Sequence, residues 1–179
     1  MYMTELWDVL DASGEKTGRF HERGKPMVSG DYHLIVHVWK HNGKGQWLID
    51  KRSQDHGISS LGDMGGKWET TGGCAIAGDS SLDAALRETK EELGLDLDAA
   101  KGTMWRRTAR CGSTGHTWFE DVWIFEHDCL IEDIRLQEGE TCEAMWASVD
   151  KIRNMMAGGE FLSEKFYPYF EDMIESFKL

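Results

Sequence analysis

Proline, paired cysteines and long apolar runs are all scarce in this chain of 179 residues. With two prolines, the sequence has no proline-rich linker, and its four cysteines form no CxxC pair of the kind that builds a zinc knuckle or a thioredoxin-like site. No apolar run approaches the roughly 20 residues that span a bilayer. We therefore expect a single domain over residues 1–179 without a membrane-spanning segment.

Positive charge is the other shortage. Lysine and arginine number 20 against 32 aspartates and glutamates, which gives a formal net charge of −12. The overall field of such a chain does not attract nucleic acid or an anionic membrane, so we expect neither as a partner. The charge can simply maintain solubility. Alternatively, the protein holds a polyanionic substrate with the help of a local cation.

The cysteines and the N-terminus indicate the compartment. Free thiols fit a reducing environment better than a secreted, disulfide-stapled protein. The first residues, Met1 to Glu5, do not form a basic region followed by an apolar stretch, so we expect no signal peptide. Together these features predict a cytoplasmic protein.

Strand patterns dominate the chain. Apolar and β-branched stretches predict strands at Glu5–Leu10, Thr17–His21, His33–Lys40, Gln46–Lys51, Trp105–Cys111, His116–Glu126 and Cys142–Trp146. The first two belong to an N-terminal strand extension over residues 1–30. Asn42-Gly43 is a strong hairpin signal between the third and the fourth.

Two helices are predicted after the last strand. Ser148 can cap the first, over Val149 to about Ala157, and the second runs from about Pro168 to Phe177. With a third helix in the middle of the chain, the order of elements indicates an α/β protein in which helices cover a mixed sheet.

The central helix carries an unusual concentration of negative charge. Asp79 or Ser80 can cap it, and Gly94 can end it in a left-handed conformation. Leucines share one face at 100° per residue, and three glutamates share the other: Glu88, Glu91 and Glu92. Like charges at this spacing repel each other by a few tenths of a kcal/mol per pair. The arrangement is typical of a site for Mg²⁺, which prefers oxygen ligands, although an ordinary solvated helix face is the alternative.

The spacing of this segment resembles the Nudix box, here residues 72–95. The box runs Gly, five residues, Glu, seven residues, Arg-Glu, an aliphatic residue, any residue, Glu-Glu, any residue, Gly and an aliphatic residue. Seven positions agree in register: Gly73, Arg87, Glu88, Glu91, Glu92, Gly94 and Leu95. Two depart, since Asp79 replaces a glutamate and Thr89 a larger aliphatic residue. The resemblance implies a single Nudix hydrolase domain, an α/β/α sandwich around a mixed sheet that the N-terminal β-hairpin extends.

The resemblance also implies the chemistry. Nudix hydrolases cut the diphosphate linkage of a nucleoside diphosphate joined to another group, with Mg²⁺, or Mn²⁺ in its place, neutralising the phosphate charge. By motif position the metal ligands are Glu88, Glu91, Glu92 and the carbonyl of Gly72. Arg87 would orient the glutamates, so Arg87 and Glu91 count among the catalytic residues. Asp79, one methylene short, is a weakened second contact to the metal site.

A further carboxylate is expected to act as the general base, because a metal-bound glutamate accepts protons poorly. Glu140 lies in the acidic, loop-like segment Gln137–Glu140, a few residues before Trp146, where hydrolases of this family often carry the base. Glu138 and Glu120 are the alternative bases. All three can also be solvated surface charges.

Two residues are candidates for holding the rest of the substrate. Arg52 ends a predicted strand ahead of the box and can fork onto a phosphate, unless it is only a solvated strand end. Trp68 lies next to the box and can stack on a base or sugar, although most of the eight tryptophans should be core. The expected partner is a small-molecule diphosphate, and a homodimer is an open alternative to a monomer.

Outside the box, the chain resembles the isopentenyl-diphosphate isomerase branch of the superfamily, through Tyr32–Trp39 and Leu48–Arg52. That isomerase needs a cysteine acid/base and a histidine-rich metal site. Here Cys74 is offset from the cysteine position, which suggests that it is not an acid/base catalyst, and His33 matches one metal histidine without its partner. Isomerase activity and a non-catalytic module that binds a nucleotide or sugar are therefore the alternatives to the hydrolase.

Overall fold

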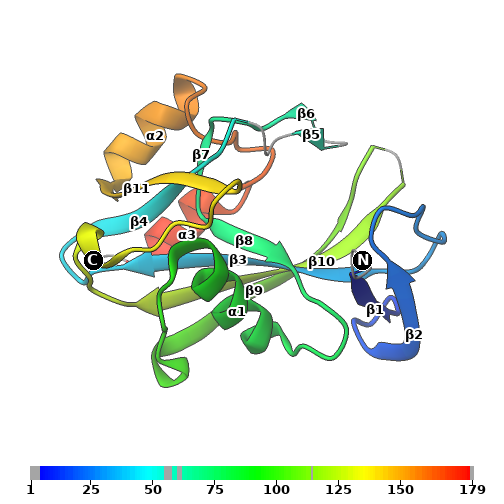
Figure 1. The fold of residues 1–179 in the computed structure, drawn as a ribbon. Coiled ribbons are helices and arrows are strands. Elements are labelled where there is room, and N and C mark those ends of the chain that lie inside the picture. Colours follow the sequence, from blue (N-terminus) through cyan, green and yellow to red (C-terminus); the bar gives the residue numbers. More distant parts are fainter. Residues whose placement is uncertain (1–4, 55–57, 60–61, 114, 178–179) are drawn as a thin grey trace.

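A mixed β-sheet forms the centre of the protein, and helices cover both of its faces (Figure 1). The computed structural model describes residues 5–54, 58–59, 62–113 and 115–177. Residues 1–4 of the expected N-terminal extension and the last two residues of the expected domain lie outside this range. The predicted fold class, an α/β protein with a mixed sheet and an N-terminal hairpin, is confirmed.

The elements follow the predicted order, with small shifts at their ends. The strands of the central sheet are β3 (His33–His41), β4 (Gln46–Arg52), β7 (Trp68–Glu69), β8 (Thr71–Cys74), β9 (Gly102–Cys111), β10 (Thr117–Glu126) and β11 (Thr141–Ser148). Two smaller pairs are β1 (Leu6–Leu10) with β2 (Lys16–Glu22), and β5 (Ile58–Ser59) with β6 (Gly62–Asp63). The helices are α1 (Ser81–Leu93), α2 (Val149–Ala157) and α3 (Phe170–Ser176), with 3₁₀ turns η1 (Ala99–Lys101) and η2 (Ile131–Asp133). The sequence pattern did not predict strands β5 to β8, none of which is longer than four residues; β8 contains two glycines.

Strands β3 and β10 pair in parallel at the middle of the sheet, from His33 opposite Trp118 to His41 opposite Glu126. The strand order is β11-β4-β3-β10-β9, with β7 against β4 and β8 against β3 in antiparallel pairings. A parallel pair requires a long crossover between its strands. Here the crossover includes α1, and it brings this helix onto one face of the sheet beside β8 (Figure 1).

The hydrophobic core lies in two layers, because alternate residues of a strand point to opposite faces. On one face Val36 and Val38 of β3 pack with Ala84 of α1. On the other face Trp39 packs with residues of both C-terminal helices, including Met173. These two layers make the α/β/α sandwich, and α1 is held on the sheet through its small alanine side chains.

Helix α1 begins and ends at residues with the expected capping chemistry. Ser80 is the N-cap: its hydroxyl accepts from the backbone N–H of Asp83 at 3.1 Å, and the Asp83 carboxylate accepts from the N–H of Ser80 at 3.0 Å. Gly94 ends the helix with φ +69°. Thr89, an unusual residue for its position in the box, is fully buried, and its hydroxyl donates to the carbonyl of Ala85 at 2.9 Å. This internal bond satisfies the polar group that replaces an aliphatic side chain.

The N-terminal hairpin is attached to the sheet at its base. Backbone hydrogen bonds of 2.8 and 3.0 Å join Leu10 and Tyr32 in both directions. The indole of Trp7 stacks on the imidazole of His33, with ring centroids 4.3 Å apart. The hairpin therefore packs against the start of β3 and forms a wall beside it (Figure 1). None of the helices in the described ranges has the length and apolar character to cross a membrane.

Gly94 generates a stability prediction. A Cβ at this position would lie 2.6 Å from Cβ of Arg135 and 3.2 Å from its carbonyl oxygen. Gly94→Ala therefore combines the strain of a positive φ with overpacking, and should reduce the free energy of unfolding by about 2–4 kcal/mol. Gly159 is the matched control, because it has φ +73° after α2 and a Cβ added there would have no described heavy atom within 4 Å. Gly159→Ala should lose only about 1–2 kcal/mol in urea denaturation; equal losses would contradict the packing argument.

Candidate active site

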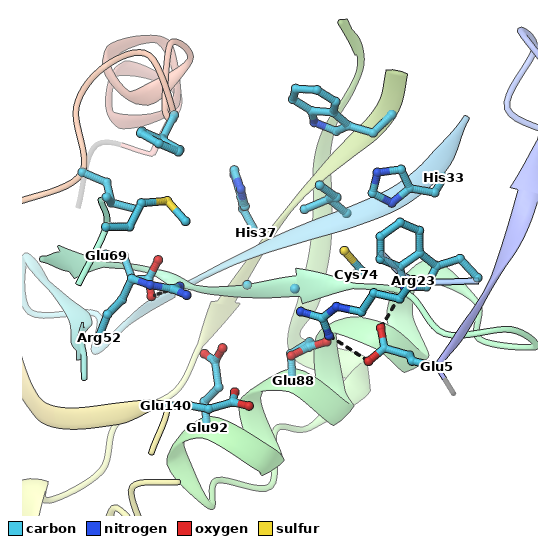
Figure 2. Close-up of a pocket in the computed structure, with 18 of the residues that line it drawn as sticks. Glu5, Arg23, His33, His37, Arg52, Glu69, Cys74, Glu88, Glu92 and Glu140 are labelled. Atoms are coloured by element: carbon cyan, nitrogen blue, oxygen red, sulfur yellow. Dashed lines mark hydrogen bonds and ion pairs between the residues drawn. The ribbon is translucent and has the colours of Figure 1, made fainter. Parts of the chain in front are cut away.

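A cavity of about 840 Å³ lies between α1 and the N-terminal hairpin. Its walls come from many parts of the chain. They include α1 with β8, strands β1, β3, β4 and β7, the segment 23–26 after β2, the turn between β9 and β10, the loop before β11 and residues just before α3. Most of the predicted site residues meet here, namely Arg52, Gly72, Arg87, Glu88, Glu91, Glu92 and Glu140. Figure 2 shows Glu69, Glu88, Glu92 and Glu140 around the same space.

Arg87, in the middle of α1, holds two of the box glutamates. Its Nη1 donates to Glu88 and to Glu91, at 2.9 Å in each case. Its Nε donates to Asp79 Oδ2 at 3.1 Å, and its Nη2 to the carbonyl of Cys74 at 3.0 Å. Asp79 therefore contacts Arg87, and through Arg87 it acts on the two glutamates.

The three box glutamates differ in their surroundings. Glu91 has a half-exposed side chain, that of Glu88 is 13% exposed, and Glu92 is buried. Burial raises the pKa of Glu88 to about 7, although Arg87 pulls in the opposite direction. Burial, reinforced by Asp50 and Glu69, raises the pKa of Glu92 well above its ordinary value. The three glutamates of the helix thus range from the half-exposed Glu91 to the buried Glu92.

A buried chain of polar groups lies close to Glu92. The ammonium of Lys40 donates to the hydroxyl of Thr71 at 2.5 Å, and this hydroxyl donates to Asp50 at 2.8 Å. One oxygen of Asp50 and one of Glu92 are buried without a hydrogen-bond partner among the described residues. Such oxygens are expensive to bury, and a cation is the kind of group that satisfies them.

The two box glycines make room for this arrangement. A Cβ on Gly73 would lie 2.3 Å from the carboxyl carbon of Glu88, and one on Gly72 would lie 2.6 Å from the carbonyl oxygen of Val36. Only glycine allows the backbone of β8 to approach Glu88 this closely. The backbone of Gly72, predicted to supply a carbonyl ligand, consequently lies at the cavity wall beside the box glutamates.

The side chains in their present rotamers do not converge on one point. Among the described residues, no group of three or more His, Cys, Asp and Glu side chains lies close enough to hold a metal ion. Glu88 and Glu91 accept hydrogen bonds from Arg87, whereas Glu92 lies near the carboxylates of Asp50 and Glu69. The donor set nevertheless fits Mg²⁺, because it consists of carboxylate oxygens lining one cavity, one of them buried and unpartnered.

The three candidate bases lie in different places. Glu140 lines the cavity, and its backbone carbonyl accepts from the N–H of Ser53 at 2.7 Å, which ties its loop to the end of β4. Glu138 is exposed. Glu120 is buried in β10 and accepts twice from Arg110, at 3.0 and 3.2 Å. Of the three, Glu140 is the carboxylate that borders the same space as the box glutamates.

Arg52 and Trp68, the candidates for substrate contacts, have different surroundings. Arg52 lines the cavity and donates to Glu69 at 2.7 Å. Trp68 is 8% exposed and belongs to the hydrophobic core with Trp39 and Phe161. This burial favours the core interpretation of Trp68 over stacking on a substrate.

Cys74 lines the cavity, although its position in the sequence is offset from that of the isomerase cysteine. Burial raises the pKa of its thiol to about 12, so the thiol stays protonated at neutral pH. The nearby His33 is buried, its Nε2 lies 2.8 Å from Nε2 of His116, and burial lowers its pKa to about 3. A neutral thiol and neutral imidazoles give no support to acid/base catalysis by Cys74.

Sequence reasoning missed several charged residues of the cavity and its surroundings, chiefly Lys40, Asp50, Glu69 and Arg23. Lys40, Asp50 and Glu69 belong to strands and are buried. A lysine and an aspartate directly after the apolar residues of predicted strands were the available signal, because charged groups are buried only when they are paired or functional. No comparable signal marks Arg23, which lies in a polar turn.

The family model for the NUDIX domain matches residues 31–170 of this chain. An uncharacterized Nudix hydrolase of Listeria monocytogenes is 34% identical over 167 residues, covering 93% of this chain and 90% of that protein. The solved structure of DR0079 from Deinococcus radiodurans has a TM-score of 0.70 at 18% identity and covers 94% of this chain and 98% of its own. A MutT protein from Methanosarcina mazei Go1 has a TM-score of 0.63 at 25% identity, covering 81% and 94%.

The raised pKa values of Glu88 and Glu92 predict how stability depends on pH. Both folded-state pKa values lie above the unfolded value of 4.5, so their stabilising contribution is complete below that value and is lost as pH rises through the folded pKa, about 7 for Glu88. The buried His33 and His37 have lowered pKa values and the opposite sign, but they stop contributing above their unfolded value of 6.5. In chelator, the unfolding free energy should therefore fall as the pH rises above about 6.5, at up to about 1.4 kcal/mol per pH unit for Glu92. The Glu88 part is half as steep at pH 7 and nearly complete by about pH 8, and Glu69, whose pKa burial raises to about 8, adds to the fall.

Thermal melts of Glu88→Gln and Glu92→Gln in chelator test this dependence. Both variants should show a shallower fall than the wild-type protein, and the exposed Glu132→Gln should match the wild type. Parallel pH curves for all four proteins would show that the box carboxylates are not the groups responsible.

Proposed function

The chain belongs to the NUDIX domain family and is a Nudix pyrophosphohydrolase, and from this premise we propose that it uses Mg²⁺ to hydrolyse the diphosphate linkage of a nucleoside diphosphate joined to another group. One observation carries the proposal: the three box glutamates and Glu140 line a single cavity together with Gly72. A polyanionic diphosphate would be repelled from so many carboxylates unless a cation came with it.

We assign the metal to Glu88, Glu91 and Glu92 with the backbone carbonyl of Gly72. When bound, Mg²⁺, or Mn²⁺ in its place, neutralises charge on the phosphate oxygens and so favours attack at phosphorus. The unpartnered buried oxygen of Glu92 and the close approach of Gly73 to Glu88 support this assignment.

The positively charged residues at the site have separate roles in this proposal. Arg87 is a positioning residue, because it holds Glu88 and Glu91 and is itself held by Asp79. Arg52, fixed to the cavity wall by Glu69, is assigned to a phosphate oxygen of the substrate, for which its fork of N–H donors is suited.

Glu140 is assigned as the general base that takes the proton from the attacking water. It borders the cavity on a loop tied to β4, whereas Glu120 is occupied by Arg110 and Glu138 is exposed. A base needs access to the reacting water and freedom from a competing cation. Those two requirements favour Glu140 over the other two carboxylates.

A panel of nucleoside diphosphate derivatives tests the function directly. The protein is incubated with each compound and Mg²⁺, and the products are separated by ion-exchange chromatography. We expect cleavage into a nucleoside monophosphate and a second phosphorylated fragment. Isopentenyl diphosphate belongs in the same panel, since double-bond isomerisation without hydrolysis of any compound would identify the isomerase instead. Tight nucleotide binding without turnover would identify a binding module.

The metal assignment predicts the behaviour of Glu92→Gln. Removing one ligand charge should lower turnover by about 10²-fold or more, because the phosphate charge is then less well neutralised. Glu132→Gln, at an exposed position in η2, should keep wild-type turnover. Both variants should retain the wild-type circular dichroism spectrum, and substantial wild-type turnover in excess chelator would rule out the metal requirement.

The base assignment predicts a different signature for Glu140→Gln. Its turnover should fall by about 10²–10⁴-fold, and the acidic limb of the pH–rate profile should disappear, because general-base catalysis contributes on this scale. The affinity for Mg²⁺ should change little. If Glu140→Gln stays near wild-type turnover while Glu120→Gln or Glu138→Gln loses it, the base is that other residue.

A further inference from the structure

The N-terminal hairpin brings positive charge to the cavity from outside the part of the chain that the NUDIX domain model matches. That match begins at residue 31. Strand β2 ends at Glu22, and the next four residues, Arg23 to Pro26, all line the cavity. A segment that precedes the matched domain therefore forms part of the wall around its glutamates.

The side chain of Arg23 is held in a defined orientation. Its Nη1 donates to one oxygen of Glu5 at 2.8 Å, and the other oxygen of Glu5 accepts from Nε1 of Trp7 at 2.8 Å. Trp7 in turn stacks on His33 of β3, and the backbone N–H of Arg23 donates to the carbonyl of Glu5 at 2.9 Å. These contacts connect the guanidinium to the central sheet and reduce the entropy that it loses on binding a ligand.

The guanidinium points toward the part of the cavity that holds the box residues. Figure 2 shows Arg23 reaching from the hairpin toward Cys74 and Glu88. Burial works to lower its pKa, but Glu5, with contributions from Cys74 and Glu140, raises the pKa above the ordinary value, so the group is charged at every relevant pH. Its side chain is nevertheless 58% exposed. A guanidinium has five N–H donors, and the bond to Glu5 uses one of them.

Arg87, by comparison, uses its N–H donors in contacts within the protein. Its nitrogens contact Asp79, Glu88, Glu91 and the carbonyl of Cys74. A substrate diphosphate that enters this acidic cavity needs a cation whose donors remain accessible. Arg23 meets that requirement on the side of the cavity that the hairpin forms.

We propose that Arg23 binds a phosphate oxygen of the substrate diphosphate, so that the N-terminal hairpin supplies a substrate-binding residue of the active site. The guanidinium fork matches the geometry of a phosphate group, which a lysine binds only as a point charge. The inference rests on the proposed function for the identity of its ligand. An ion pair with Glu5 that merely closes the hairpin is the competing role, and exposed pairs of that kind stabilise proteins only slightly.

Arg23→Ala is the decisive variant, with Arg19→Ala as its matched control. Arg19 lies on the same hairpin, is 55% exposed and also pairs with one carboxylate, Asp31, but it is not among the residues that line the cavity. Both variants therefore lose one charge and one ion pair from the hairpin. Arg23→Lys retains the charge without the fork.

Binding of α,β-methylene-ADP, whose diphosphate resists hydrolysis, is measured by calorimetry in the presence of Mg²⁺. Arg23→Ala should weaken binding about tenfold or more, as expected for loss of a charged hydrogen bond, Arg23→Lys should lie between it and the wild type, and Arg19→Ala should stay within about twofold. With the substrate that emerges from the panel, Arg23→Ala should raise KM by a similar factor and change kcat much less.

Equal affinities for the wild type and Arg23→Ala, equal losses in Arg23→Ala and Arg19→Ala, or no binding of the probe to the wild type would each overturn the inference. These outcomes are distinguishable from failure of the proposed function. In that case the wild type shows no turnover of any diphosphate in the panel, while the binding measurements still report on Arg23. Thermal melts of each variant show whether the hairpin variants remain folded.

Discussion

The close contact between strand β8 and helix α1 is the constraint on which the site depends. No side-chain atom fits between Gly73 and the carboxylate of Glu88, since a Cβ would come within 2.3 Å of it. The same strand is pressed against β3, where Gly72 lies beside Val36. In its present position the carboxylate of Glu88 can lie against the backbone of β8 because Gly73 has no side chain. At this place Arg87 contacts both Glu88 and the carbonyl of Cys74.

Bringing these carboxylates together makes their charged forms unfavourable. Burial raises the pKa of both Glu88 and Glu92, and repulsion from neighbouring carboxylates raises it further. Arg87 offsets part of this repulsion at Glu88, and Lys40 offsets part of it at Glu92. Well-packed apolar residues of similar volume often replace buried charges without loss of stability. Retaining so many here therefore points to chemistry, where perturbed pKa values and unpaired oxygens have a use.

The cavity is a joint product of segments that are far apart in the sequence. The box supplies its acidic wall, the loop before β11 supplies Glu140, and the hairpin supplies Arg23. Only the first of these belongs to a motif with fixed spacing. Substrate selection by such a site depends on the surrounding segments, because the diphosphate chemistry at the box is common to many substrates. Hydrogen bonds from Arg23 to Glu5 and from Trp7 to Glu5 give the hairpin segment a defined position.

The sequence by itself determined the family, the order of the elements and the box helix, because these follow from local patterns: the spacing of Gly73, Arg87 and Glu88, the capping signals, and the alternation of apolar residues in strands. It did not separate Ser80 from Asp79 as the cap, and it left open whether Trp68 stacks on a substrate or belongs to the core, where its burial favours the core. Only the tertiary structure decided which charged residues outside the box meet the glutamates. Pairing of β3 with β4 and β8 buries Lys40 and Asp50 beside Glu92, and packing of the hairpin on His33 turns Arg23 toward Glu88. Contacts of this kind depend on the register between distant strands and on burial, and the spacing of residues along the sequence does not predict either.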